Sequence, residues 1–183
     1  MSTPEGEDYI VLLDPAWSAG DSGEPPVEAV AGLWPVRADG TLGRFRSNPD
    51  YRPVDPDAPT DPIDAALRDL AYADSSVEQL QVVLRDSLLE LALNGDDRPL
   101  VVRSPDDALC AVVVSAEPHR RRVAAPLWAR VTIEEVAERL PAGADVLVNP
   151  DGPAAMRLTA DFIRRAAAFT DQDVIEAYER LSS

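Results

Sequence analysis

Residues 123–158, VAAPLWARVTIEEVAERLPAGADVLVNPDGPAAMRL, contain the strand, helix and turn signals that decide the fold class. Thr132 and Glu135 form a T-x-x-E capping box, which predicts the start of a short helix. Thr159 and Thr170 then stand where N-caps would begin two terminal helices. The β-rich runs around these helices are 100–102, 109–115, 123–128, 145–148 and 156–158. This pattern predicts an α+β fold with a mixed, mainly antiparallel sheet and helices packed on it.

Two helices are predicted upstream of this stretch. Asp61 as N-cap and Pro62 at the first helical position begin one helix, which ends near Tyr72. Leucines at helical spacing predict a second helix, from Ser75 to the stop at Asn94-Gly95. Together they suggest a helical hairpin that covers a sheet.

The N-terminal third has a different character. A short apolar run at 9–13 predicts a strand. The dipeptide Asp39-Gly40 between the segments 29–36 and 42–46 is a strong hairpin signal. The proline-rich segment 47–62 excludes a continuous helix or a central strand.

The length of 183 residues fits one domain. We therefore expect residues 1–183 to form a single α+β domain. Residues 1–60 would be its Pro/Gly-rich strand-and-hairpin part, and residues 61–183 its body. We expect the N-terminal part to pack against the body, because its strands would otherwise expose unpaired edges.

Composition argues against most enzyme classes. The chain has one cysteine, one histidine and no lysine, so all 17 of its basic residues are arginine. Schiff-base and P-loop lysines are therefore missing, and one histidine with one cysteine cannot complete a structural zinc site. We expect a protein that is not an enzyme and that uses no cofactor or metal. Exclusive use of arginine also suggests a GC-rich, actinobacterial genome.

Charge and hydropathy limit the partners. A net charge of −16 repels phosphate backbones, so we expect no nucleic-acid binding unless one face locally reverses the sign. No apolar run is long enough to span a bilayer, which predicts no membrane insertion. The acidic start of the chain does not resemble a signal peptide, so we expect a cytoplasmic protein.

The only concentrated basic cluster is His119, Arg120, Arg121 and Arg122. It could be a docking patch for an acidic partner, or a solvated β-turn whose arginines pair with some of the 33 acidic residues. As a catalytic base His119 is improbable, because the arginines would lower its pKa and only Glu117 could orient it.

The second candidate site is the turn Asn149, Pro150, Asp151 and Gly152. These residue types make turns wherever they occur, but a rigid turn could also serve recognition. The candidate protein-binding residues are therefore His119, Arg120, Arg121, Arg122, Asn149, Pro150, Asp151 and Gly152.

The segment from Arg98 to Ala166 resembles the SseB amino-terminal domain family. The resemblance is carried by LCAVVVSAEP, by PLWARVTIEEVAERLPAGADVLVNPDGPAAMRL and by the helix that follows. In that family a short helix ending in Leu-Pro precedes a strand ending in Asn-Pro-Gly. Here Asp151 is inserted before the glycine, so the last element departs from the family pattern.

The N-terminal half is similar to actinobacterial proteins associated with type VII secretion. PPVEAVAGLWPVRADGTLGRFRSNPDYRP and DAPTDPIDAAL carry this likeness. It implies an accessory protein, such as an adaptor, chaperone or regulator, that binds secretion machinery or a secreted substrate. It implies no catalytic residue.

Two alternatives stay open. An immunity protein that blocks a secreted toxin would also suit an acidic chain. A small-molecule enzyme using only Asp, Glu and Arg would need a pocket lined by a carboxylate of strongly raised pKa. The partner, the binding face and the oligomeric state are left undetermined by the residues.

Overall fold

The computed structural model describes residues 8–18, 23–72 and 77–181. Its helices are α1 (Pro62–Ala71), α2 (Val77–Arg85), α3 (Glu117–Arg120), α4 (Ile133–Arg139), α5 (Ala160–Ala167) and α6 (Asp171–Leu181), with a 3-10 turn at Val27–Ala29. Its strands are β1 (Tyr9–Leu13), β2 (Val30–Pro35), β3 (Arg46–Ser47), β4 (Leu89–Leu93), β5 (Val101–Arg103), β6 (Leu109–Val114), β7 (Leu127–Val131), β8 (Asp145–Val148) and β9 (Met156–Leu158). None of the described helices is long and apolar enough to cross a membrane.

The larger of two sheets has six strands in the order β7-β4-β6-β8-β9, with β5 pairing to β6 off this path. Only β6 and β8 run parallel; their pairs run from Cys110 with Asp145 to Val113 with Val148. The other pairings in this sheet are antiparallel. The predicted α+β class with a mixed, mainly antiparallel sheet is thus confirmed.

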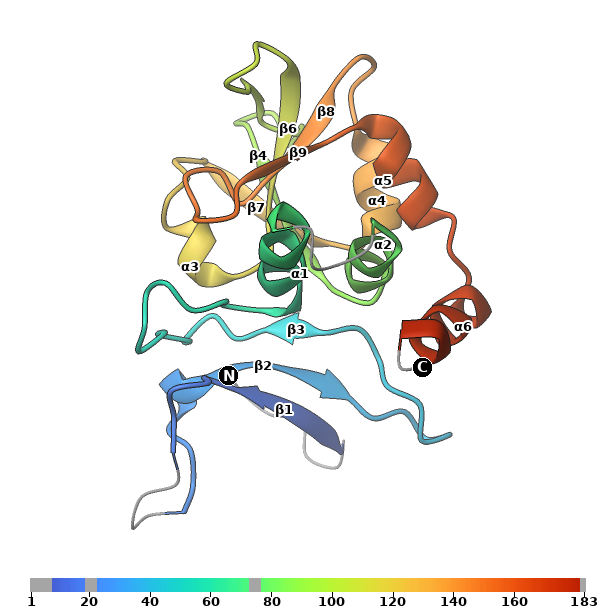
Figure 1. The fold of residues 1–183 in the computed structure, drawn as a ribbon. Helices are drawn as coiled ribbons and strands as arrows, with labels where there is room; N and C mark the ends of the chain where they lie inside the picture. Colours follow the sequence, from blue (N-terminus) through green and yellow to red (C-terminus); the bar gives the residue numbers. More distant parts are fainter. Residues whose placement is uncertain (1–7, 19–22, 73–76, 182–183) are drawn as a thin grey trace.

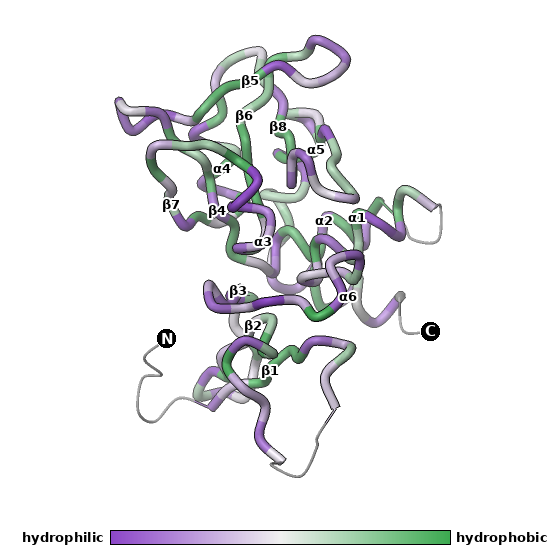
Figure 2. Tube along the Cα trace, turned by 90° about the vertical axis from the view of Figure 1, so that its left-hand side faces the viewer, coloured by the Kyte–Doolittle hydropathy of each residue, from purple (hydrophilic) through white to green (hydrophobic). Residues whose placement is uncertain are grey.

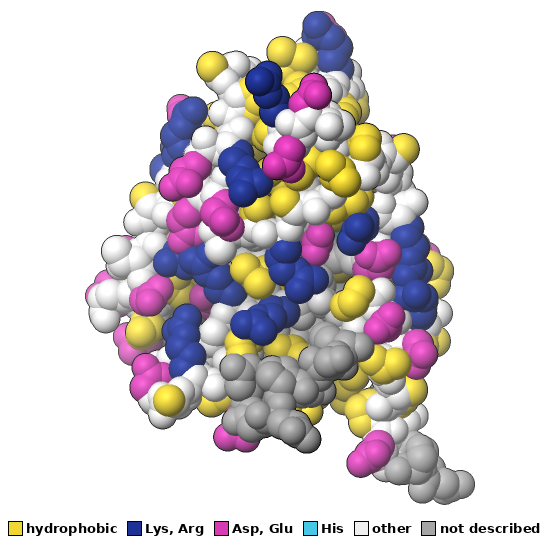
Figure 3. Space-filling view, turned by 180° about the vertical axis from the view of Figure 1, so that it is seen from behind, with side chains coloured by type: hydrophobic (Ala, Val, Ile, Leu, Met, Phe, Trp, Pro, Cys, Tyr) yellow, Lys and Arg dark blue, Asp and Glu magenta, His cyan; other side chains and the backbone are white. Residues whose placement is uncertain are grey.

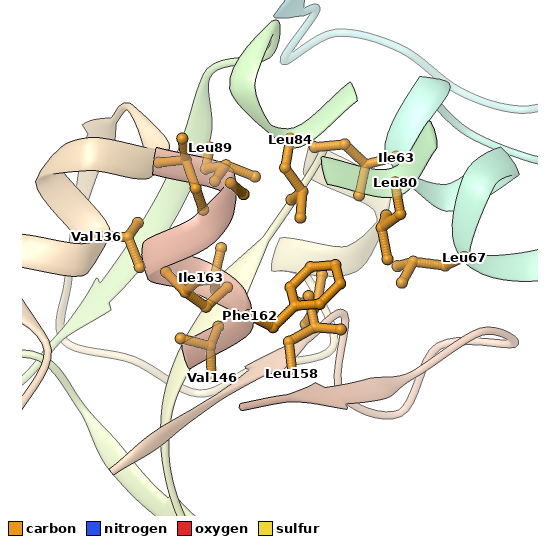
Figure 4. Close-up of a cluster of buried hydrophobic side chains, with 14 of the residues drawn as sticks. Ile63, Leu67, Leu80, Leu84, Leu89, Val136, Val146, Leu158, Phe162 and Ile163 are labelled. Carbon is orange, nitrogen blue, oxygen red and sulfur yellow. The ribbon is translucent and has the colours of Figure 1, made fainter. Parts of the chain in front are cut away.

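Four helices cover one face of this sheet and build the main core. Figure 4 shows the side chains of α1, α2, α4 and α5 converging on those of the strands. Val113 of β6 faces this core, whereas its neighbour Val112 points to the opposite face, as strand alternation requires. In Figure 2 the tube is hydrophobic along β6, the central strand of the sheet.

The predicted helix caps are present. The Asp61 carboxylate accepts hydrogen bonds from the backbone N–H groups of Ile63 and Asp64, and Pro62 opens α1. Thr132 and Glu135 form a reciprocal capping box at the start of α4. The Thr159 hydroxyl accepts from the backbone N–H of Phe162 at α5. Each cap satisfies backbone groups that the helix itself leaves unpaired.

The predicted helix from Ser75 to Asn94 is wrong over its second half. Its start lies in residues 73–76, outside the described residues, and α2 ends at Arg85. Leu89–Leu93 forms β4, paired to β6 on one side and to β7 on the other. Leucine, glutamate and alanine favour helix locally, but pairing on both edges of a central strand outweighs that preference.

The predicted strand at 123–128 is displaced. The observed strand β7 is Leu127–Val131, and it begins directly after Pro126. β7 lies at the edge of the sheet and, among the described strands, pairs only with β4, which ends at Leu93 opposite Leu127, so the residues before Leu127 have no strand to pair with. Val123 and Ala124 instead border a groove described below.

A small three-stranded sheet, β1-β2-β3, lies apart from the larger one, with α1 and α2 between the two (Figure 1). The predicted hairpin is present at its tip, where the Arg37 N–H donates to the Thr41 carbonyl (2.8 Å) and Val36 pairs with Leu42. The backbone of Phe45 is bonded to Asp86 and Leu88 at 2.7 and 2.8 Å. Residues 44–46 thus join the small sheet to the junction of α2 and β4.

Tyr51 and Asp14 hold the proline-rich segment against the small sheet. Both side chains are buried, and the Tyr51 hydroxyl donates to the Asp14 carboxylate at 2.9 Å. The backbone N–H of Val54 donates to the same Asp14 oxygen at 3.0 Å. Burial and the hydrogen bond to Asp14 raise the pKa of Tyr51 well above its usual value, so the phenol stays protonated.

Candidate functional site

The two predicted clusters lie side by side. Residues 119–122 belong to α3 and the turn after it, and residues 149–152 form the turn that follows β8. The Arg122 guanidinium donates to the Asp151 carbonyl at 2.8 Å. A Cβ atom on Gly152 would lie 3.0 Å from His119 Nδ1, so the glycine packs directly against the imidazole ring. Segments separate in the sequence thus form one surface region.

His119 is not part of a solvated turn. It lies on the short helix α3, and only 1% of the residue is exposed. The expectation that only Glu117 could orient it is also wrong, because Nε2 lies 3.9 Å from Asp61 Oδ2 and 3.7 Å from Asp64 Oδ1. Both carboxylates come from the start of α1, far from His119 in sequence.

Thr60 connects the histidine to these carboxylates. Its hydroxyl oxygen lies 2.9 Å from His119 Nε2 and 2.8 Å from Asp61 Oδ2. A hydroxyl has one proton, and the carboxylate can only accept it, so Thr60 donates to Asp61 and accepts from the Nε2–H of His119. This fixes the Nε2–H tautomer of a neutral imidazole. Nδ1 then lies buried beside Gly152 with no hydrogen-bond partner.

Ser115 and Asn149 extend the buried network to the ends of the parallel strands β6 and β8. The Ser115 hydroxyl donates to Asp61 at 2.8 Å, and the Asn149 amide donates to the Ser115 hydroxyl at 2.9 Å. The Ser115 backbone N–H donates to the Asn149 side-chain oxygen at 2.9 Å. Asn149 is fully buried and has a φ of +50°, a left-handed conformation that asparagine tolerates better than most residues.

Burial sets the charges of this network. It lowers the pKa of His119, although Asp61 and Asp64 oppose the shift, so the imidazole is neutral near pH 7. Burial raises the pKa of Asp61, against the opposing effects of His119 and of its hydrogen-bond donors. Asp64 is paired with Arg68 at 3.0 Å. Asp64 thus has an ionic partner at Oδ2, whereas its Oδ1 is buried without a hydrogen-bond partner among the described residues.

The network offers little for acid–base catalysis. Asp61 accepts four hydrogen bonds, from two backbone N–H groups and two hydroxyls, so its lone pairs are occupied. Asp61 also lines an apolar cavity of about 360 Å³ between α1 and the small sheet. A carboxylate of raised pKa therefore does border a pocket, but it has no free position for a substrate proton. Cys110 is buried, and burial raises the pKa of its thiol, which disfavours the reactive thiolate.

The open surface next to the network is a groove of about 610 Å³ on the face of the larger sheet opposite the main core. Its apolar lining comes from β5, β6, β8 and the flanking loops: Leu100, Val102, Pro105, Val112, Val123, Ala124, Leu147, Pro150 and Ala155. Arg103, Ser104, Arg122 and Asp151 are its polar lining residues. Both predicted clusters therefore contribute to this groove, through Arg122, Pro150 and Asp151.

The arginines of the basic cluster differ in their pairing. Arg120 lies near Glu90 and Glu117, each at 3.8 Å, and its guanidinium stacks on the Trp128 ring. Arg121 pairs with Glu117 at 3.5 Å. Arg122 is exposed, and the described part of the chain provides no carboxylate in ion-pair contact with it. Arg122 is thus the member left available to an acidic group at the groove.

Sequence reasoning missed Thr60, Asp64 and Ser115, and it recognised Asp61 only as a helix cap. The spacing of Asp61 and Asp64 places both carboxylates in the first helical turn, but nothing in that spacing indicates a histidine partner. Among the described residues, no group of three histidine, cysteine, aspartate or glutamate side chains could hold a metal ion. Searches of protein-family models, curated proteins and solved structures returned no match to this chain.

Proposed function

We propose that this protein is a non-catalytic, cytoplasmic accessory factor that binds another protein through the groove on the larger sheet. It would act as an adaptor, chaperone or regulator of a type VII-like secretion system. The groove supports the binding role. The link to secretion is supported only by the resemblance of residues 25–53 and 57–67 to type VII secretion-associated proteins and of residues 98–166 to the SseB amino-terminal domain family.

One observation carries the binding proposal: the two segments singled out in the sequence meet at the same apolar groove. Val102, Val112 and Leu147 from three adjacent strands give it an apolar floor. An apolar surface that a fold leaves open, bordered by polar groups, is typical of a docking site. A volume of about 610 Å³ is sufficient for several side chains of a partner.

The rim indicates the chemistry of the partner. Arg122 has no ion-pair partner among the described residues, and it stands at the edge of a groove whose lining is mainly apolar. An acidic side chain next to apolar ones would satisfy this guanidinium while the apolar side chains cover the floor. We therefore expect the partner to insert an apolar segment that carries an aspartate or glutamate.

The test starts from capture of the tagged protein at low salt, followed by purification of the partner and titration against variants. Val102→Arg places a charge in the groove, whereas Val101→Arg places the same charge on the neighbouring residue, which is 38% exposed and is not part of the lining. We expect Val102→Arg to abolish binding and Val101→Arg to preserve it. Equal effects of the two substitutions would reject the groove as the docking site.

A second pair of variants tests the charge. Arg122→Glu should raise the dissociation constant for the partner tenfold or more, which is the loss expected when one charged hydrogen bond is removed. Arg139→Glu makes the same change at an exposed position on α4 that does not line the groove, and it should have no effect.

The identity of the captured protein decides between the two binding roles. Secretion ATPase components or secreted substrates would support the accessory role. A single toxin domain whose activity this protein suppresses would establish the immunity alternative instead. An empty capture, followed by turnover of a small molecule, would favour the enzyme alternative.

A further inference from the structure

A second cavity, separate from the groove, is lined by three arginines. Arg37, Arg44 and Arg46 border a space of about 340 Å³ at the junction of the small sheet and the body. Its other lining residues are Pro35, Val36, Gly43 and Leu88, so no carboxylate belongs to the lining. The chain has 33 acidic and 17 basic residues, so a cavity lining with three arginines and no carboxylate has the opposite sign of charge to the chain as a whole. Figure 3 shows arginine side chains, interspersed with acidic ones, across the middle of the rear face.

One of the three arginines is already neutralised. Arg44 donates two hydrogen bonds to the Glu134 carboxylate, at 2.6 and 3.0 Å. The same carboxylate lies 3.0 Å from Arg85, so one negative charge is shared by two guanidinium groups. This pairing fixes Arg44 beside the cavity. Arg85 is paired in turn with Asp171 at 3.3 Å, so the positive charge left at the cavity comes from Arg37 and Arg46.

The other two arginines lack such a partner. The Arg37 guanidinium is exposed and donates a long bond, 3.4 Å, to the Thr41 hydroxyl. Hydrogen bonds from Thr41 lower the pKa of the nearby Asp39 carboxylate, and Arg37 contributes to this shift without forming an ion pair with Asp39. Arg46 is exposed as well. Within the described ranges, neither guanidinium forms an ion pair with a carboxylate. Two unpaired guanidinium groups facing the same space repel each other, and an anion between them would remove that repulsion.

The backbone around the cavity is held in place. Gly43 is buried, and a Cβ on it would lie 2.7 Å from the Pro35 ring, so this close approach requires glycine. The Gly43 N–H donates to the Pro35 carbonyl at 2.7 Å. Hydrogen bonds of Phe45 to Asp86 and Leu88 fix the next residues. These contacts fix the backbone from which the arginine side chains extend, so the backbone contributes little to the entropic cost of binding.

We propose that this cavity binds a small oxyanion, a phosphate ester or a polycarboxylate, with Arg37 and Arg46 as its donors and Arg44 as a fixed neighbour. The planar guanidinium forms paired hydrogen bonds to phosphate and carboxylate oxygens, which makes arginine the suitable residue for both ligands. A space of about 340 Å³ corresponds to about ten water-sized groups, which is enough for one such molecule. The site does not depend on the groove, so either proposal can fail alone.

The experiment is calorimetric titration of the full-length protein with inorganic pyrophosphate and, separately, with citrate, at low salt and neutral pH. The variants are Arg37→Gln and Arg46→Gln, which change exposed side chains without ion pairs in the described structure. Arg165→Gln on α5 is the control, because it removes an arginine that is also exposed and is not part of the cavity lining. Urea unfolding of each variant verifies that its fold is intact.

We expect the wild type to bind at least one of the two anions with a dissociation constant below about 1 mM, weakening as salt increases. Each cavity variant should raise the dissociation constant tenfold or more, which is the loss expected when one charged hydrogen bond is removed. Arg165→Gln should leave the dissociation constant unchanged. If only pyrophosphate binds, the cavity is a phosphate site. If only citrate binds, it is a carboxylate site, and if both bind, it is a general oxyanion site. No binding of either anion, or equal binding by the cavity variants, would overturn the proposal.

Discussion

Replacing Asn149 by alanine tests whether the buried network holds the turn that borders the groove. Asn149 is fully buried, accepts the Ser115 N–H at 2.9 Å and donates to the Ser115 hydroxyl at 2.9 Å. Asn149→Ala removes both bonds and leaves the Ser115 N–H without its side-chain acceptor, at a cost of about 1–3 kcal/mol. The left-handed backbone, with φ of +50°, adds about 1 kcal/mol for a residue such as alanine.

The two contributions sum to a loss of about 2–4 kcal/mol in the free energy of unfolding. Urea unfolding followed by circular dichroism and tryptophan fluorescence measures this loss, provided that the two probes agree. Asn149→Gly is the matched control, because it removes the same hydrogen bonds but accepts the left-handed conformation. It should be more stable than Asn149→Ala by about 1 kcal/mol.

The reasoning would be refuted if Asn149→Ala changed stability by less than about 0.5 kcal/mol, as a surface substitution does. If Asn149→Gly were no more stable than Asn149→Ala, only the backbone part of the argument would fail. Because Pro150 and Asp151 follow directly and line the groove, Asn149→Ala should also weaken partner binding.

Three further predictions concern other parts of the fold. Asp14→Ala should lower the free energy of unfolding in urea by about 2–3 kcal/mol, because the buried Tyr51 hydroxyl loses its acceptor. Burial alone would raise the pKa of Asp14, but its hydrogen bonds lower that pKa below 3.8. The stabilisation by the Asp14 carboxylate is therefore present above pH 3.8 and is lost on acidification. Burial lowers the pKa of His119 in the folded state below 6.5, so the unfolded chain binds the proton more readily and stability should fall as the pH drops below that value. His119→Gln removes this titration and should make the free energy of unfolding depend less on pH in that range. An unchanged slope would contradict the buried neutral imidazole. Leu91→Ala should lower the free energy of unfolding by about 2–5 kcal/mol, because Leu91 is buried in the main core. Leu127→Ala, at a half-exposed position, should lower it much less. Similar losses for the two variants would contradict the position of β4 in the core.

Local signals in the sequence predicted the elements that depend on local physics. The capping box of Thr132 and Glu135 and the Asp61-Pro62 start of α1 are satisfied within one turn of helix, so the residues themselves specify them. Asp39-Gly40 specified its hairpin for the same reason: Gly40 adopts a φ of +84°.

What the sequence did not predict depends on contacts distant along the chain. Leu89–Leu93 has a helical composition, and only pairing to β6 and β7 makes it a strand. The buried state of His119 depends on Thr60, 59 residues earlier, and on the adjacent carboxylates, which no local pattern connects to it. No local pattern indicated that the two candidate clusters adjoin, because the parallel pairing of β6 and β8 is what brings Ser115 and Asn149 together.

The most direct test of the docking proposal is photo-crosslinking in living cells from a residue of the groove. A photoreactive amino acid replaces Ala124, which is exposed and borders the groove, or Ala168, which is equally exposed at the end of α5 and is not part of the lining. We predict that one protein is crosslinked from position 124 and not from position 168. Crosslinking of that protein from position 168 alone, or no crosslink from position 124, would contradict the account.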